Sequence, residues 1–306
     1  MALTVDGALS DAHRGVRALE LAITKRLEGM LHGDHRGVLP GPGWESGEGR
    51  PYQVGDDVRR IDWSLTARSN EVHVRDTIAD HELETWVVID GSASLDFGTD
   101  QWEKRDLAIA VAATFGFLSC QGGSRFGVVV AEPSGPTVHP ALGGIDHVRR
   151  TLRQLQRRPR SDRPGSGTVD LAAAVERIAR LGRRPGLVVL VSDLLSDPDA
   201  DARWVRALRA HSVRAHTIVA ELRDRRDDQL PAVGLVTLVD PETGGVRDVY
   251  TDDARLRSRF AEAAAERRSA MRVAVRRSGA DHLVLATDRD WLTDIVRHHL
   301  TKRNLR

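Results

Sequence analysis

Three short apolar runs limit this chain to a small set of folds. They are Trp86–Ile89, Phe126–Ala131 and Leu187–Val191, each long enough for one buried strand and too short for a helix. Helical patterns of apolar residues lie between them, and further short runs follow at 213–220 and 281–286. Strands that alternate with helices form parallel sheets covered on both faces. The sequence therefore predicts an α/β fold with a doubly wound, mainly parallel, Rossmann-like sheet.

Two of these runs end on an aspartate that has hydroxyl side chains beside it. Asp90, Ser92 and Ser94 follow the first run, and Asp193 follows the third. If the first three strands of such a sheet grow outward, the first and fourth strands are neighbours, and ligands bind beyond their carboxyl ends. The two carboxylates would then repel each other unless a cation lay between them. Oxygen donors of this kind are those that Mg²⁺ prefers.

A purely structural interpretation of these residues stays open. Asp90 could cap a helix after a strand and a polar turn. Thr168 follows the flexible 165–167 loop at the start of a helical pattern, where it is an N-cap, a ligand or both.

The first third of the chain has a different pattern. Residues 10–31 form one apolar stripe at helical spacing, expected to dock on the core of the same chain; its members are Val16, Leu19, Ile23, Leu27 and Met30. Residues 33–55 are rich in glycine and proline and predict loops or short edge strands. Alternating apolar residues at 61–65 and 72–74 predict two short strands around a turn.

A second β segment is expected near the C-terminus. Residues 235–239 and 246–250 flank a Pro-Glu-Thr-Gly-Gly turn, which is typical of a β-hairpin. We expect this hairpin to be an insertion near 232–251 that packs against the 55–76 strands. The expected domains are residues 1–82, a helix and β appendage, and residues 83–306, the α/β domain.

Composition argues against several classes of protein. The 45 basic and 44 acidic residues nearly cancel, so no strong field attracts nucleic acid or an anionic membrane. Cys120 is the only cysteine, which excludes an internal disulfide and a thiolate zinc site. Glu221–Gln229 is a charge run expected to be a solvated loop. No apolar run is long enough to span a membrane, and the start has no signal-peptide pattern. These features predict a cytoplasmic protein.

With these motifs the chain resembles the von Willebrand factor type A (vWA) domain. Asp90, Ser92, Ser94, Thr168 and Asp193 match, in order, the five elements of that fold's metal-ion-dependent adhesion site. The stretch GRPYQVGDDVRRIDWSLTAR resembles the signature that precedes the vWA domain in the bacterial "domain of unknown function 58" family. The C-terminal third is also similar to that family, but the membrane segment that many members carry is missing.

The resemblance implies a role for each matching residue and a kind of partner. Asp90, Ser92 and Ser94 would hold Mg²⁺ or Mn²⁺, Thr168 would bind it directly or through water, and Asp193 would act mainly through water. A carboxylate from a partner protein would complete the coordination. The family is associated with MoxR-type AAA+ ATPases, so the resemblance implies an adaptor or chaperone-like partner of one.

Three functions follow from these features. The first is a non-catalytic, metal-dependent protein-interaction module, because the chain has no Walker A, Gly-x-Ser-x-Gly or His-Glu-x-x-His motif. The second is a Mg²⁺-dependent phosphotransferase or phosphatase with Asp90 as the nucleophile. Such enzymes generally need a carboxylate as general acid two residues later, where this chain has Ser92. The third is a nucleic-acid binder that uses the basic helices near Arg149–Arg160.

Overall fold

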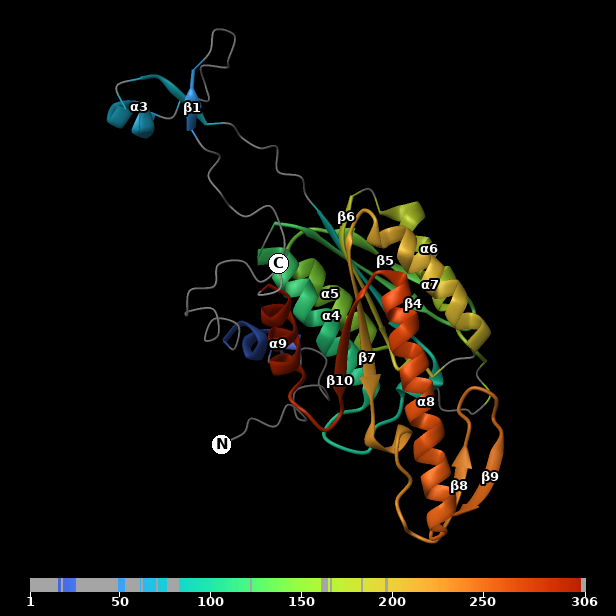
Figure 1. Cartoon of the computed structure of the whole chain (residues 1–306). Helices are drawn as coiled ribbons and strands as arrows, with labels where there is room; N and C mark the ends of the chain where they lie inside the picture. The colour runs from blue at the N-terminus through green and yellow to red at the C-terminus, as the bar shows by residue number, and fades with distance from the viewer. Residues whose placement is uncertain are drawn as a thin grey trace.

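The centre of the structure is a six-stranded sheet with the strand order β10-β7-β6-β3-β4-β5 (Figure 1). This computed structural model describes residues 16–17, 19–25, 49–52, 61, 63–69, 71–75, 83–121, 123–160, 165, 167–182, 184–195 and 198–303. The strands of the sheet are β3 (Glu84–Asp90), β4 (Arg125–Ala131), β5 (Thr137–Leu142), β6 (Pro185–Ser192), β7 (His216–Arg223) and β10 (Asp281–Ala286).

All neighbouring strands are parallel except the antiparallel pair of β4 and the edge strand β5. The first strand of the sheet in sequence, β3, lies between the second and the fourth, β4 and β6. This order confirms the predicted doubly wound sheet and its switch point between β3 and β6. Parallel strands covered on both faces are nearly continuous apolar runs, and all seven residues of β3 are buried.

Helices cover both faces of the sheet. On one face, α4 (Lys104–Gln121), α5 (Ile145–Gln156) and α9 (Trp291–Arg303) pack into one buried cluster with the strands. On the other face, α6 (Leu171–Leu181), α7 (Pro198–Ser212) and α8 (Ala254–Ser278) pack into a second cluster (Figure 1). No helix in these described ranges is both long and apolar enough to cross a membrane.

The predicted N-terminal helix is confirmed where the structure describes it. Residues 16–17 and 19–25 are helical, and Val16, Leu19 and Ile23 are buried in the same cluster as α4 and α5. The stripe therefore docks on the core of its own chain, as expected. Leu27 and Met30 lie outside the described residues.

The predicted strand at 61–65 is wrong. Trp63–Ser69 forms a short helix, α3, and the β1 strand (Gly49–Pro51) pairs with β2 (His73–Arg75) instead. Three alternating apolar residues are too few to fix an extended strand, and Trp63 is 70% exposed, so its side chain is not held on a sheet face. The division of the chain at residues 82 and 83 stays a prediction.

The C-terminal hairpin forms as its own two-stranded sheet. β8 (Leu235–Val239) pairs with β9 (Val246–Tyr250), and neither strand pairs with β1 or β2 in the described part of the chain. The expected shared β module is therefore not formed by strand pairing. Figure 1 shows the hairpin beside α8.

The Glu221–Gln229 segment is not the solvated loop that its charges suggested. β7 continues through Arg223, and Glu221 and Asp224 are buried. Glu221 pairs with Arg223 and His282, and Asp224 accepts hydrogen bonds from Thr99 and Thr287. Glu221 and Asp224 are buried because side chains of the fold, mostly distant in sequence, pair with their carboxylates. The local run of charged residues therefore predicted solvent exposure wrongly.

Gly127 tests the packing around Trp86, on the face of the sheet that α6, α7 and α8 cover. A Cβ at this position would lie 2.7 Å from the ring of Trp86, which is almost fully buried, and 3.0 Å from the backbone nitrogen of Ala141. We expect Gly127→Ala to lower the free energy of unfolding by about 1–3 kcal/mol, measured by urea denaturation. Gly143→Ala is the control, because no atom lies within 4 Å of its Cβ position. Equal stabilities of the two variants would contradict this packing.

Candidate metal site

The pairing of β3 with β6 places the first part of the candidate site. Ile89 pairs with Val191, so the next residues, Asp90 and Ser192, leave the sheet side by side. The Ser192 hydroxyl donates a hydrogen bond of 2.5 Å to Oδ2 of Asp90. Both residues are buried at the carboxyl edge of the sheet, where ligands bind in folds of this kind.

The loop after β3 folds two hydroxyls toward each other. The backbone N–H of Ser92 donates to Oδ1 of Asp90 at 2.9 Å, and the Oγ atoms of Ser92 and Ser94 are 3.0 Å apart. Ser94 lies in the single 3₁₀ turn η2 (Ala93–Leu95), and both serines are buried. Gly91 is needed here because a Cβ would lie 2.4 Å from the carbonyl oxygen of Ala131.

This donor set fits a small divalent cation. Two neighbouring ligands of octahedral Mg²⁺, each about 2.05 Å from the ion and at a right angle, are about 2.9 Å apart. The Ser92 and Ser94 oxygens are 3.0 Å apart. Each Asp90 oxygen accepts one hydrogen bond from Ser92 or Ser192 and keeps a lone pair for a further contact. Among the described residues, no three His, Cys, Asp or Glu side chains form a metal cluster on their own, so the hydroxyls are essential to this set.

Asp193 is engaged by a buried lysine. Lys104 Nζ is 2.9 Å from Asp193 and 2.8 Å from Asp227, and the lysine side chain is 1% exposed. The other Asp193 oxygen accepts from the backbone N–H of Leu195 at 3.3 Å. Burial alone would lower the pKa of Lys104, but the charges of Asp193 and Asp227 outweigh it and raise the pKa above its usual value. Lys104 therefore stays protonated and offsets the charge of Asp193.

Within the described part of the chain, Asp90 has no basic partner comparable to Lys104. Burial raises its pKa to about 6, and the nearby charge of Asp193 adds to the rise, while hydrogen bonds from Ser192 and Ser92 oppose it. A cation beside Asp90 would favour the charged form and reverse this rise. The raised pKa of Asp90 and the spacing of the serine oxygens thus both favour a small divalent cation at this place.

Thr168 is the most exposed of the five predicted residues. It precedes α6, whose N-cap is Asp170, so the alternative of Thr168 as N-cap is wrong. The neighbouring Gly167 lies against Pro133, with 3.5 Å from its Cβ position to the proline ring. Pro133 lines a cavity together with Asp90, which brings the 167–168 loop to the same edge of the sheet. The structure thus places Asp90, Ser92, Ser94 and Asp193 in one buried group and Thr168 on the loop beside it.

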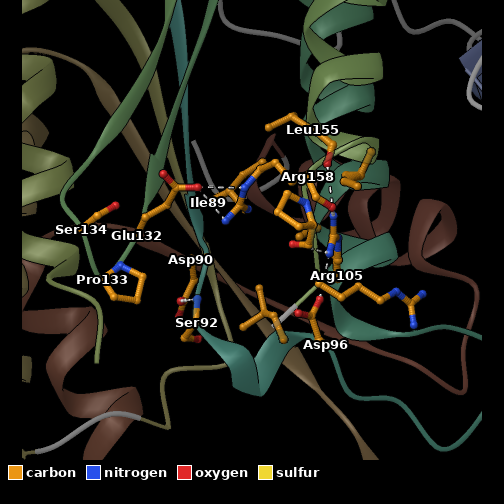
Figure 2. A pocket seen from close by; sticks show the side chains of 16 residues that line it. Ile89, Asp90, Ser92, Asp96, Arg105, Glu132, Pro133, Ser134, Leu155 and Arg158 are labelled. Carbon is orange, nitrogen blue, oxygen red and sulfur yellow. Dashed lines mark hydrogen bonds and ion pairs between the residues drawn. The ribbon is translucent and has the colours of Figure 1, made fainter. Parts of the chain in front are cut away.

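A cavity of about 270 Å³ opens next to Asp90 and Ser92. Figure 2 shows these two residues on one side of it, with Arg105 and Arg158 on the other. Arg158 forms an ion pair of 3.0 Å with Glu132, and Arg105 pairs with Asp96 at 3.2 Å. The cavity wall therefore carries paired charges of both signs, suited to a polar or charged group that approaches Asp90.

Sequence reasoning missed four residues around the site. Ser192 could have been included, because it precedes Asp193 at the end of a strand. Lys104 and Asp227 meet Asp193 only through tertiary packing, and nothing local distinguishes them from surface charges. The backbone carbonyl of Glu242, in the turn of the β8–β9 hairpin, accepts a hydrogen bond from Gly167 in the loop before Thr168. Burial and the charges of Asp90, Asp193 and Asp240 raise the pKa of Glu242 to about 7.

The fold and these residues define an α/β domain with an oxygen-rich site at its switch point. The family model described as "Protein of unknown function DUF58" matches residues 48–270. The chain belongs to this family. The uncharacterized protein Rv1480 of Mycobacterium tuberculosis is 48% identical over 288 residues, covering 94% of this chain and 89% of that protein.

Solved structures with similar folds include two that cover most of this chain. One is the conserved hypothetical protein BatB from Bacteroides thetaiotaomicron, with a TM-score of 0.43, 11% identity and coverage of 73% of this chain and 100% of that one. The other is the SpRpn10 VWA domain, with a TM-score of 0.39, 10% identity and coverage of 70% and 93%. Likenesses this distant carry no information on ligands or partners.

Lys104→Met tests the buried ion group. The substitution keeps the length of the side chain but leaves the buried Asp193 and the partly buried Asp227 without their cation. We expect the free energy of unfolding to fall by about 3–5 kcal/mol. Arg203→Met is the control, because its ion pair with Asp170 is exposed and contributes about 1 kcal/mol at most. Urea denaturation measures both, and a loss of less than about 1 kcal/mol for Lys104→Met would contradict the role of Lys104.

Asp90→Asn tests the electrostatic cost at Asp90. Because its pKa is about 6 in the folded protein, Asp90 contributes stability at pH 4 that is lost as the pH rises through 6. An asparagine side chain does not ionise, so the variant does not lose this stability as the pH rises. In EDTA, the unfolding free energy of the variant minus that of the wild type should be roughly 2 kcal/mol larger at pH 8 than at pH 4. Urea denaturation at both values measures it, and a difference that does not change with pH would contradict the assignment.

Proposed function

We propose that this protein is a non-catalytic protein-interaction module whose binding depends on Mg²⁺ or Mn²⁺. Asp90, Ser92 and Ser94 hold the cation, while Thr168 and Asp193 contribute directly or through water. The observation that carries the proposal is the 3.0 Å pairing of the Ser92 and Ser94 hydroxyls beside the buried Asp90 carboxylate. The carboxyl edge of the sheet is negatively charged at Asp90 and Asp193, and a bound cation allows it to bind an acidic group.

The partner in this proposal supplies a carboxylate. Mg²⁺ bound by few protein ligands keeps water in its remaining positions, and a carboxylate readily replaces one of them. The cavity beside Asp90 gives such a side chain a path to the ion, and Arg105 and Arg158 line that path. We propose a MoxR-type AAA+ ATPase as the partner because the signature at residues 49–68 resembles that of the family associated with these ATPases.

Two observations support an interaction module over the alternatives. An aspartyl phosphotransferase needs an accessible nucleophile, but Asp90 is 5% exposed and both of its oxygens accept hydrogen bonds. A nucleic-acid surface needs free cations, but Arg149, Arg158 and Arg160 pair with Glu20, Glu132 and Glu103. The burial of Asp90 disfavours nucleophilic attack by its carboxylate, and the ion pairs disfavour binding of phosphates by these three arginines.

Affinity capture from a lysate of the source cell tests this function. Wild type in Mg²⁺ should retain a AAA+ ATPase, identified by mass spectrometry, and EDTA or Asp90→Ala should reduce its recovery at least tenfold. Asp146→Ala is the matched control, because that side chain is 82% exposed at the start of α5. Circular dichroism checks that each variant is folded. Equal capture of the same partner in EDTA and by Asp90→Ala would contradict the proposal.

A further inference from the structure

The turn of the β8–β9 hairpin is held in one shape by its own hydrogen bonds. The Asp240 carboxylate accepts from the backbone N–H of Glu242 at 2.9 Å and from the Thr243 hydroxyl at 2.6 Å. The backbone N–H of Gly244 donates to the Asp240 carbonyl at 2.9 Å. The turn therefore presents Glu242 on a defined backbone.

This turn docks on the loop that leads to Thr168. The backbone N–H of Gly165 donates to the Pro241 carbonyl at 3.0 Å, and the N–H of Gly167 donates to the Glu242 carbonyl at 3.2 Å. Two backbone bonds thus tie the hairpin to the loop of the candidate site. These contacts fix where the backbone of Glu242 lies relative to the loop that leads to Thr168.

The Glu242 carboxyl faces the charges of the candidate site. It is partly buried, and after burial the largest causes of its raised pKa are Asp90 and then Asp193. The negative charges at the end of β3, after β6 and on the hairpin turn therefore act on one another, although the three carboxylates do not form one cluster among the described residues. Without a cation their charges repel one another, and a divalent ion between them turns the same arrangement into an attractive one.

The strands of the hairpin are poorly held by apolar packing. Leu235, Val246 and Tyr250 are each at least 60% exposed. At the base of the hairpin, the Thr251 N–H donates to the Gly234 carbonyl at 2.7 Å and the Val233 N–H donates to the Thr251 hydroxyl at 3.1 Å. With little apolar area to lose, the turn is able to leave the 165–167 loop while the base stays in place.

We propose that Glu242 is an internal carboxylate ligand of the cation site. It takes the coordination position that the proposed function gives to the partner, so the hairpin turn must leave before a partner carboxylate binds. The inference rests on the proposed function, because it needs a cation at Asp90, Ser92 and Ser94. It adds a sixth residue to the site and a contact within the chain that competes with the partner.

Mn²⁺ titration calorimetry on the full chain tests this role. Glu242→Ala should weaken Mn²⁺ binding about tenfold or more, the size expected when a supporting group of a metal site is lost. Excess acetate should restore the affinity of this variant, because it fills the vacated position, and should leave the wild type unchanged. Asp248→Ala is the matched control, since this carboxylate of β9 is exposed and accepts a hydrogen bond from Thr237 on the neighbouring strand of the hairpin; it should bind Mn²⁺ as the wild type does.

Hydrogen exchange supplies a readout that is independent of affinity. In the wild type, Mn²⁺ should slow amide exchange at residues 165, 167, 240 and 242–245, and in Glu242→Ala it should not. If Glu242→Ala binds Mn²⁺ as the wild type does while Asp90→Ala does not, the role of Glu242 is overturned and the cation site stands. If the wild type binds no Mn²⁺, the proposed function fails together with this inference.

Discussion

The parallel pairing of β3 and β6 places two acidic residues at one edge of the sheet. Because Ile89 pairs with Val191, Asp90 leaves the sheet beside Ser192, and Asp193 follows Ser192 directly. Both are buried, so water screens their repulsion poorly. Much of the surrounding structure serves to offset this charge: a buried lysine, a serine hydroxyl and the backbone N–H groups of the loops all contact the two carboxylates.

The two carboxylates are stabilised in different ways. Asp193 has a permanent counter-charge in Lys104, which is fixed on α4 and also pairs with Asp227. Asp90 is contacted by hydrogen bonds from Ser92 and Ser192 but by no basic side chain among the described residues, and its pKa remains raised. One half of the site is thus complete within the protein, while the other half gains from an added cation. This asymmetry agrees with a role for Asp193 at a distance from the ion and a direct role for Asp90, Ser92 and Ser94.

The hairpin extends this logic to a third acidic residue. In our proposal Glu242 is a ligand of the cation, carried on a turn that two backbone hydrogen bonds from Gly165 and Gly167 anchor beside the candidate site. A cation would strengthen this docking, and a competing carboxylate would weaken it. In our account the same ion therefore controls both the docking of the hairpin and the access of a partner.

The sequence predicted those features that depend on local pattern. The apolar runs that end at Asp90 and Asp193 gave the sheet, its switch point and the positions of the candidate ligands, because strand polarity fixes where such residues emerge. Lys104 was beyond prediction, since the Asp193 that it contacts is 89 residues away. Glu242 was equally hidden, because a charged turn residue is usually solvated. The 61–65 alternation failed because three residues do not determine a strand without a neighbour to pair with.

Crystals grown with Mn²⁺ and measured at the manganese absorption edge would test the central claim most directly. The account requires one anomalous peak bonded to the hydroxyl oxygens of Ser92 and Ser94, with Asp90 beside it and the Glu242 carboxylate or an added carboxylate completing the shell. Such a peak would establish the site in a single experiment. A well-ordered structure in Mn²⁺ with no anomalous peak at these residues, and with Asp90 still held only by Ser92 and Ser192, would contradict it.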